Sequence, residues 1–445
     1  MTEVVVIGAD ANGLVTAELL RRAGHSVTLL QEEAPRGRTV GWAPPEVANA
    51  LELSGLELYC PDPWLRAPLG DGGMFELWRD MARSVESIRR LDARDAERWP
   101  RFCERMATLA RLLERIYVEP PPSLVDLRFA FRLRRLGRQG MEDLMRLLPM
   151  PVAELLDEWF QSDVLKGALG AHAVRHVMQG PRSAGTAFRL LHYHAGSPPG
   201  VFRTPSSNLA GLLRARSTIT VRQAKTARIA VRNGEVTGVV LEGGEELRAS
   251  LVVSAVDPRR TLTELTEPGW LDPDLVRALR HVRSRGVAVK LAITFERPPD
   301  WTTLTLAPSL DYVERAYDDA KHGRVSAQPW LDLLAEGKVA EVHFQYVPHQ
   351  QAGDANIGAL ATKLLAPHAP AITECKLARL PAAWPEGQPH QAELALDQAL
   401  WMRPLPELSG YRTPVDGLWL CGQAMHPAVS GVGGYNCARA ILRNT

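Results

Sequence analysis

The sequence predicts an α/β fold, with a Rossmann-like domain assembled from discontinuous segments of the chain and an α+β domain inserted between them. Near the N-terminus, the apolar run Val4–Ile7, a glycine turn, helical spacing over Leu14–Ala23 and a second apolar run, Val27–Leu30, form a β-α-β unit. The C-terminus repeats this order, with a buried strand at Gly417–Cys421, a glycine-rich turn and a helix at Tyr435–Leu442. We therefore expect both ends of the chain in one sheet-based domain.

Length and composition favour a two-domain globular protein. A chain of 445 residues is too long for one core, and 45% hydrophobic with 23% charged residues is ordinary for a folded protein. Lys+Arg number 52 and Asp+Glu 51, so no net field favours nucleic acid as a partner. The five scattered cysteines and an N-terminus that begins directly with a strand predict a cytoplasmic protein. No apolar run is long enough to span a membrane.

The middle of the chain divides into a mainly helical part and a part rich in strands. The turn Asn233-Gly234 between two apolar runs predicts a hairpin. We expect helices at Asp80–Arg90, Asp95–Val118, Leu124–Leu148 and Pro151–Phe160, and further strands at Ala249–Ser254, Val287–Phe295 and Glu341–Tyr346. The predicted boundaries place residues 1–60, 201–265 and 405–445 in the Rossmann-like domain, and residues 61–200 and 266–404 in the inserted domain.

The turn after the first strand reads GADANG, from Gly8 to Gly13. A dinucleotide fingerprint has glycine at the first, third and sixth positions, for the tight turn, the approach of the pyrophosphate and the close packing of the helix. Gly8 and Gly13 fit this degenerate GxGxxG motif, whereas Asp10 places an anion where the pyrophosphate should meet the helix N-terminus. The motif therefore supports the fold more strongly than the binding of a dinucleotide.

The second strand ends in Gln31 and Glu32, where an acidic residue would bind the ribose hydroxyls. Gln31 occupies the expected position of the acid. Its neutral amide hydrogen-bonds a hydroxyl more weakly than a carboxylate does. A polar loop at the strand end is the alternative interpretation.

Four long segments give the chain a family resemblance: VVSAVDPRRTLTEL (residues 252–265), MRPLPELSGYRTPVDGLWLCG (402–422), LKGALGAHAVRHVMQGPRSAGTAFRLLHY (165–193) and EVHFQYVPH (341–349). They resemble the phytoene desaturase-like FAD-dependent oxidoreductases, and most closely the branch called pyridine nucleotide-disulfide oxidoreductase domain-containing protein 2. The resemblance extends over essentially the whole chain. It implies an FAD domain and a substrate domain, and an apolar or amphipathic small-molecule substrate.

The resemblance also implies which residues lie against the cofactor. Near the ADP half and the following loop these are Gly8, Asp10, Asn12, Gly13, Gln31, Glu32, Gly37 and Arg38. In the C-terminal motif beside the flavin ring and pyrophosphate they are Gly422, His426, Pro427, Gly431, Gly434, Tyr435 and Asn436. His426 is the candidate catalytic residue, able to orient substrate or to act as an acid or base; packing at the start of the helix is an equal alternative.

Five departures from the family pattern lie at positions that face the cofactor. They are Asp10, Gln31, Arg38, Ser206-Ser207-Asn208 and Ala428-Val429-Ser430, which replace glycines or an acid. Two hypotheses follow: an FAD-dependent oxidoreductase, or a degenerate member that has lost the flavin and serves as a binding or scaffold protein or a non-redox enzyme. In the first hypothesis, Arg38 offers a cation that offsets Asp10.

Other candidate sites have simpler interpretations. His172 and His176 would share a helix face, but no further ligands are spaced to form a metal site, so we expect polar or core histidines and no metal. The basic, apolar stretch 128–146 predicts either peripheral membrane contact or a solvated helix face. Cys421 and Cys437 are expected to be small buried hydrophobes. The eleven tryptophans are assigned to core packing or to an apolar cavity.

Overall fold

The computed structural model describes residues 2–32, 39–121, 134, 137–285, 288–351, 353, 355–378 and 388–444. Its centre is a five-stranded parallel sheet in the order β18-β12-β1-β2-β8. The strands are β1 (Glu3–Ile7), β2 (Ser26–Gln31), β8 (Thr220–Gln223), β12 (Leu251–Ser254) and β18 (Leu418–Leu420). Segments from the start, middle and end of the chain thus form one sheet, which confirms the predicted Rossmann-like fold.

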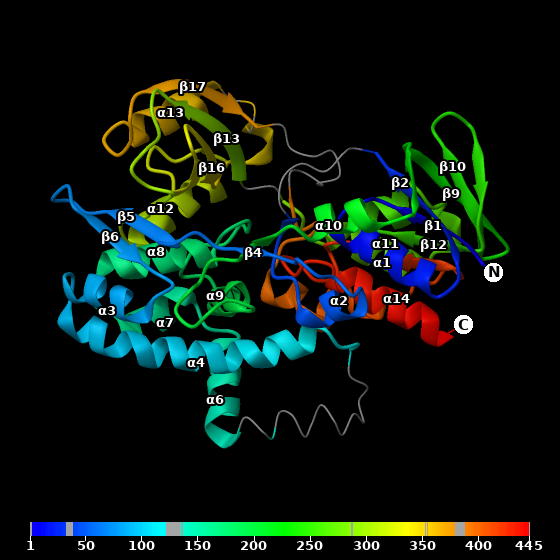
Figure 1. The fold of residues 1–445 in the computed structure, drawn as a ribbon, viewed down its shortest axis with the longest axis horizontal. Helices are drawn as coiled ribbons and strands as arrows, with labels where there is room; N and C mark the ends of the chain where they lie inside the picture. The colour runs from blue at the N-terminus through cyan, green and yellow to red at the C-terminus, as the bar shows by residue number, and fades with distance from the viewer. Residues whose placement is uncertain are drawn as a thin grey trace.

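Two helices from opposite ends of the chain lie side by side on this sheet. Helix α1 (Ala11–Arg22) packs against α14 (Val432–Asn444), and the blue and red helices of Figure 1 show this pairing. A Cβ atom at Gly434 would lie 2.1 Å from the carbonyl oxygen of Asn12, so glycine permits this close approach. Helix α14 begins at Val432, three residues before the predicted start.

The predicted hairpin is present at the outer end of the domain. Strands β9 (Thr226–Arg232) and β10 (Glu235–Leu241) pair in antiparallel fashion, and β11 (Glu246–Arg248) joins β10. Asn233 and Gly234 have φ angles of 53° and 82°, as a type I′ turn requires.

The second part of the molecule contains an antiparallel sheet and a group of helices (Figure 1). The sheet has the order β14-β15-β16-β13-β17 and encloses a separate apolar core with its covering elements. Its strands are β13 (Ala288–Phe295), β14 (Thr303–Leu306), β15 (Leu331–Glu336), β16 (Val339–Gln345) and β17 (Ile372–Leu377).

The remaining α-helices and strands connect these two parts. The helices are α2 (Pro45–Ala50), α3 (Met81–Arg89), α4 (Ala93–Tyr117), α6 (Gly137–Leu147), α7 (Val152–Trp159), α8 (Asp163–Ala173), α9 (Thr186–His194), α10 (Leu209–Arg216), α11 (Pro273–His281), α12 (Leu310–Lys321) and α13 (Ala355–Leu365). The short strands are β3 (Thr39–Val40), β4 (Leu58–Tyr59), β5 (Leu65–Pro68), β6 (Met74–Leu77) and β7 (Ser206–Ser207).

Two expectations about the helical part need qualification. The predicted helix Leu124–Leu148 falls largely on residues outside those described, and α6 covers its C-terminal part. His172 and His176 do not share a helix face, because α8 ends at Ala173 and His176 has a φ of 58° beyond it; that interpretation was wrong. Within the described residues, no helix is both long and apolar enough to cross a membrane.

Candidate functional site

The turn between β1 and α1 requires glycine at two positions, because a side chain there would be strained or would overlap the backbone. Gly8 has a φ of +100° and donates its N–H to the carbonyl of Leu30 at 2.9 Å. A Cβ atom at Gly13 would lie only 1.9 Å from the carbonyl oxygen of Gly8. The first turn of the helix can therefore approach the end of the strand, as a dinucleotide-binding turn requires.

Asp10 is the N-cap of α1. Its Oδ1 accepts a hydrogen bond from the backbone N–H of Gly13 at 2.8 Å. Burial raises the pKa of this carboxyl to about 6, against the opposing effects of the N–H groups of Gly13 and Asn12 and the charge of Arg214. Arg214 in α10 donates to the carbonyl of Ala9, directly before the cap. The carboxyl group of Asp10 and the guanidinium of Arg214 thus lie together at the N-terminus of α1.

Asn12 joins the N-termini of α1 and α14. Its Oδ1 accepts from the N–H of Gly434 at 3.3 Å, and Thr16 Oγ1 donates to the carbonyls of both residues. The buried Nδ2 of Asn12 makes no hydrogen bond to any described residue, although its proximity to Asp10 helps to lower the pKa of that carboxyl. Two helix N-termini and an unsatisfied amide therefore meet at one place.

The side chains at the end of β2 already have protein partners. Gln31 Nε2 donates to Gln223 Oε1 on the neighbouring strand β8 at 3.1 Å. Glu32 forms an ion pair with Arg260, with distances of 2.5 and 3.1 Å. The residues predicted to bind ribose thus lie at the carboxyl end of β2, where their side chains contact other protein side chains. Gly37 and Arg38 lie outside the described residues.

The loop before α14 is covered by the segment Gly41-Trp42. Ser430 N donates to the Trp42 carbonyl at 2.7 Å, and Ser430 Oγ donates to the Gly41 carbonyl at 3.1 Å. A Cβ atom at Gly41 would lie 2.8 Å from backbone atoms of Ala428. Ala428, Val429 and Ser430 are 5%, 2% and 0% exposed, so protein atoms cover the whole loop.

The indole ring of Trp42 packs against another segment. The ring lies over Gly196, where a Cβ atom would be 2.0 Å from the indole. The side chain is only 8% exposed and belongs to the main apolar core, so core packing, predicted for the tryptophans, is confirmed at Trp42.

The other glycines of the C-terminal motif allow close backbone packing. Gly431 has a φ of +77°, and a Cβ atom there would lie 3.0 to 3.2 Å from Val15, Leu209 and Val47. A Cβ atom at Gly422 would lie 2.5 Å from the carbonyl oxygen of Ala255. These contacts fix the loop between the sheet and α14.

His426 belongs to a buried hydrogen-bond network. Asn436 Nδ2 donates to the Tyr411 hydroxyl at 3.0 Å and to the Tyr117 carbonyl at 2.8 Å. The Tyr411 hydroxyl proton is then free for His426 Nε2, 2.7 Å away, so this nitrogen is an acceptor. Burial and then the charge of Arg403 lower the pKa of His426 to about 3, which keeps the ring neutral.

Pro427 and Tyr435 complete the predicted set in this region. Pro427, beside His426 in the sequence, is buried. The ring of Tyr435 is partly exposed, and the guanidinium of Arg439 lies over it, 4.9 Å from the ring centroid. Of the C-terminal candidates, Gly434 contacts Asn12 of the N-terminal turn, and His426 and Asn436 meet at Tyr411, while Gln31 and Glu32 lie at the end of β2.

The predicted interpretation of the histidines agrees with their surroundings. His172, His192 and His194 are buried, and burial lowers the pKa of each. In the part of the chain that the structure describes, no group of three His, Cys, Asp or Glu side chains could hold a metal ion. Cys421 and Cys437 are buried free thiols, as expected.

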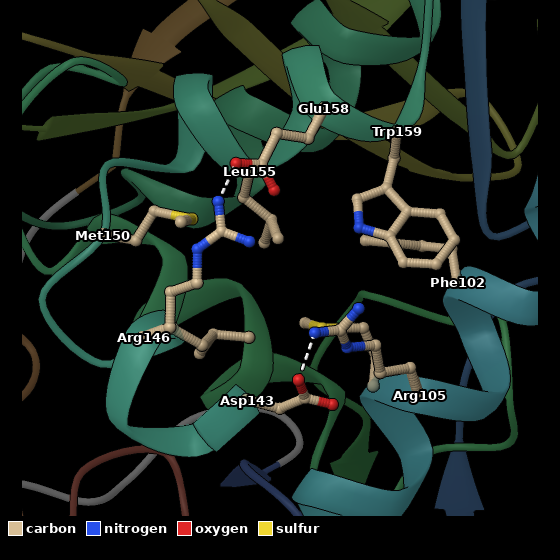
Figure 2. Close-up of a pocket in the computed structure, with 10 residues that line it drawn as sticks. Phe102, Arg105, Asp143, Arg146, Met150, Leu155, Glu158 and Trp159 are labelled. Atoms are coloured by element: carbon tan, nitrogen blue, oxygen red, sulfur yellow. Dashed lines mark hydrogen bonds and ion pairs between the residues drawn. The ribbon is translucent and has the colours of Figure 1, made fainter. Parts of the chain in front are cut away.

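A separate pocket lies between α4, α6 and α7 (Figure 2). Its lining includes Phe102, Met150 and Trp159. Ion pairs join Arg105 to Asp143 and Arg146 to Glu158 across its rim. Each of these charged residues of the rim is paired with an opposite charge. The pocket therefore combines apolar side chains with ion pairs and offers a ligand no unpaired charge among the described residues that line it.

Comparisons with known proteins agree with this geometry. Residues 220–434 match the family model described as flavin containing amine oxidoreductase. The chain is 27% identical to pyridine nucleotide-disulfide oxidoreductase domain-containing protein 2 of Rattus norvegicus, over 99% of this chain and 93% of that protein. It is 26% identical to hydroxyneurosporene desaturase of Rubrivivax gelatinosus, over 56% of this chain and 52% of that protein.

Solved structures share the fold. Putrescine oxidase bound to putrescine superposes with a TM-score of 0.61 at 14% identity, covering 100% of this chain and 98% of that one. The resemblance expected from the sequence is confirmed, and the match to a flavin-containing family model supports a flavin cofactor.

The residues present fit the two halves of FAD unequally. The glycine turn, the two helix N-termini and the unsatisfied Nδ2 of Asn12 fit the ADP half. At the end predicted to hold the flavin ring, the contact between Trp42 and Ser430 closes the loop.

Proposed function

We propose that this chain, which carries a domain of the flavin-containing amine oxidoreductase family, is an FAD-dependent oxidoreductase that acts on an apolar or amphipathic small molecule. The observation that supports this most directly is the meeting of the N-termini of α1 and α14 at the Gly8 turn, built from opposite ends of the chain. Such a site favours a pyrophosphate, because backbone N–H groups and helix dipoles point at it. When bound, the flavin supplies the hydride-accepting chemistry.

The chain's own residues would bind and orient the cofactor. Gly8 and Gly13 let the backbone approach the phosphates, and Arg214 adds a cation at the same helix end. Glu32 and Gln31 lie where a ribose would be bound, once released from their present partners. His426 acts as a positioning residue, because its Nε2 is held by Tyr411 and its ring stays neutral.

The substrate class rests on the relatives. The chain resembles a protein named for the desaturation of hydroxyneurosporene, and an extended polyene of this kind is mainly apolar. A buried, aromatic-rich helical part around Trp64, Trp99 and Phe202 agrees with an apolar environment next to the nucleotide-binding domain.

A second candidate function is favoured by the closed loop. A degenerate member that works without flavin, as a binding or scaffold protein or a non-redox enzyme, would retain the contacts of Trp42 with Ser430 and of Asp10 with Gly13 permanently. The partners of Gln31 and Glu32 agree with this alternative.

The visible absorption spectrum of the purified, untagged protein distinguishes the two candidates. Flavin released by denaturation is quantified, and the flavin-free protein is then titrated with FAD. Near-stoichiometric FAD, or saturable binding of added FAD, supports the oxidoreductase. A colourless protein that binds no added FAD supports the flavin-free alternative.

A further inference from the structure

Asp10 holds a position that the pyrophosphate of a bound dinucleotide would have to share. Its carboxylate lies at the convergence of two helix N-termini. We propose that Asp10 competes with the phosphate groups of FAD for this position and thereby makes FAD a dissociable ligand of this chain. This inference rests on the proposed function and concerns how the same site is controlled.

The Asp10 carboxylate competes with a phosphate in two ways. Its Oδ1 already accepts the N–H of Gly13, which a phosphate oxygen would otherwise accept. Its negative charge also repels an incoming pyrophosphate. By comparison, Asp80 caps α3 through an equivalent 2.8 Å bond from Arg83 N, but at an exposed helix end without a second helix N-terminus beside it.

The surroundings of Asp10 are those of an anion site. Arg214 is held beside it through the carbonyl of Ala9, and the charge of Arg214 acts on the Asp10 carboxyl. The Nδ2 of the fully buried Asn12 makes no hydrogen bond to the described residues. These groups remain available to a phosphate when the Asp10 carboxylate is neutralised or removed.

Competition by Asp10 lowers the apparent affinity without abolishing binding. When only a fraction of the molecules is competent to bind, the apparent Kd is raised by the inverse of that fraction. Removing the Asp10 charge should strengthen the binding of both ADP and FAD, because both carry the pyrophosphate.

The test is calorimetric titration of the full-length, flavin-free chain with ADP and with FAD. Asp10→Asn keeps a good N-cap but removes the charge, and we expect at least tenfold tighter binding of both ligands. Asp80→Asn is the matched control and should change neither affinity.

Thermal melting establishes that each variant is folded. ADP and FAD affinities that are unchanged in Asp10→Asn would overturn the inference, and so would wild-type protein whose FAD survives extensive dialysis. The latter result still supports the oxidoreductase. A wild type and an Asp10→Asn variant that both bind neither ADP nor FAD would overturn the inference together with the proposed function.

Discussion

The guanidinium of Arg214 donates a hydrogen bond to the carbonyl oxygen of Ala9, one residue before the cap of α1. Helix α10 thereby brings a cation to the N-terminal end of a neighbouring helix. The charge of Arg214 acts on the Asp10 carboxyl, and the same guanidinium would pair with a phosphate bound at this helix end.

Arg214→Gln should therefore weaken ADP binding to the Asp10→Asn variant by about tenfold, since a hydrogen bond to a charged group contributes about 1.5–3 kcal/mol. Equilibrium titration measures the effect. Arg216→Gln, on the same helix, removes only exposed bonds to Ser54 and should leave ADP affinity unchanged. Equal effects of both substitutions would contradict a specific role for Arg214.

The Asp10 carboxyl should make stability depend on pH. Its pKa is raised from 3.8 to about 6, so the folded state binds this proton more tightly than the unfolded state does, and stability is lost as pH rises through about 4 to 6. The charged or titratable groups facing Asp10 are Arg214 and the Cys421 thiol, whose pKa burial raises well above neutrality.

Asp10→Asn should therefore be more stable than the wild type at pH 7, with the difference shrinking toward pH 4. Urea unfolding at several pH values measures it. A difference between the two proteins that is constant from pH 4 to pH 7 would show that the carboxyl does not titrate in this way.

Gly13→Ala should destabilise the fold by roughly 3 kcal/mol, because the added methyl group would overlap the carbonyl oxygen of Gly8. Gly211→Ala in α10 is the matched control. No atom lies near its Cβ position, so it should stabilise the protein by about 1 kcal/mol through helix propensity. Thermal or urea denaturation distinguishes the two; similar values for both would contradict the close packing of α1 on β1.

Tyr411→Phe should cost about 1–3 kcal/mol of stability, because it removes the partner of His426 Nε2 and of Asn436 Nδ2 inside the protein. Tyr312→Phe, which removes a less buried hydroxyl bonded to the carbonyl of Pro329, should cost less. The free energies of unfolding in urea provide the comparison. A smaller loss in Tyr411→Phe would show that the network contributes little.

Local sequence patterns predicted the sheet and its helices well. The apolar runs around Val5 and Val253 define buried parallel strands, and Asn233-Gly234 defines a turn, because each pattern acts within a few residues. The family resemblance then placed the C-terminal loop beside the N-terminal turn.

The contact between Trp42 and the loop before α14 could not be predicted in this way. The contact between Trp42 and Ser430 joins residues almost 390 positions apart, and no local pattern specifies such a pair. The end of α8 before His176 was missed for a related reason. His176 has a left-handed backbone conformation, and its N–H donates to the side-chain oxygen of Gln345 in strand β16. This strand lies far from α8 in the sequence.

The pairing of α1 with α14 has a consequence for how the protein matures. The turn at Gly8 precedes Gly434 by more than 400 residues. A nascent chain therefore cannot form this pairing before residue 434 has been synthesised. A premature stop codon ahead of α14 would leave the turn at Gly8 without its partner helix, even if the segments between them had already folded.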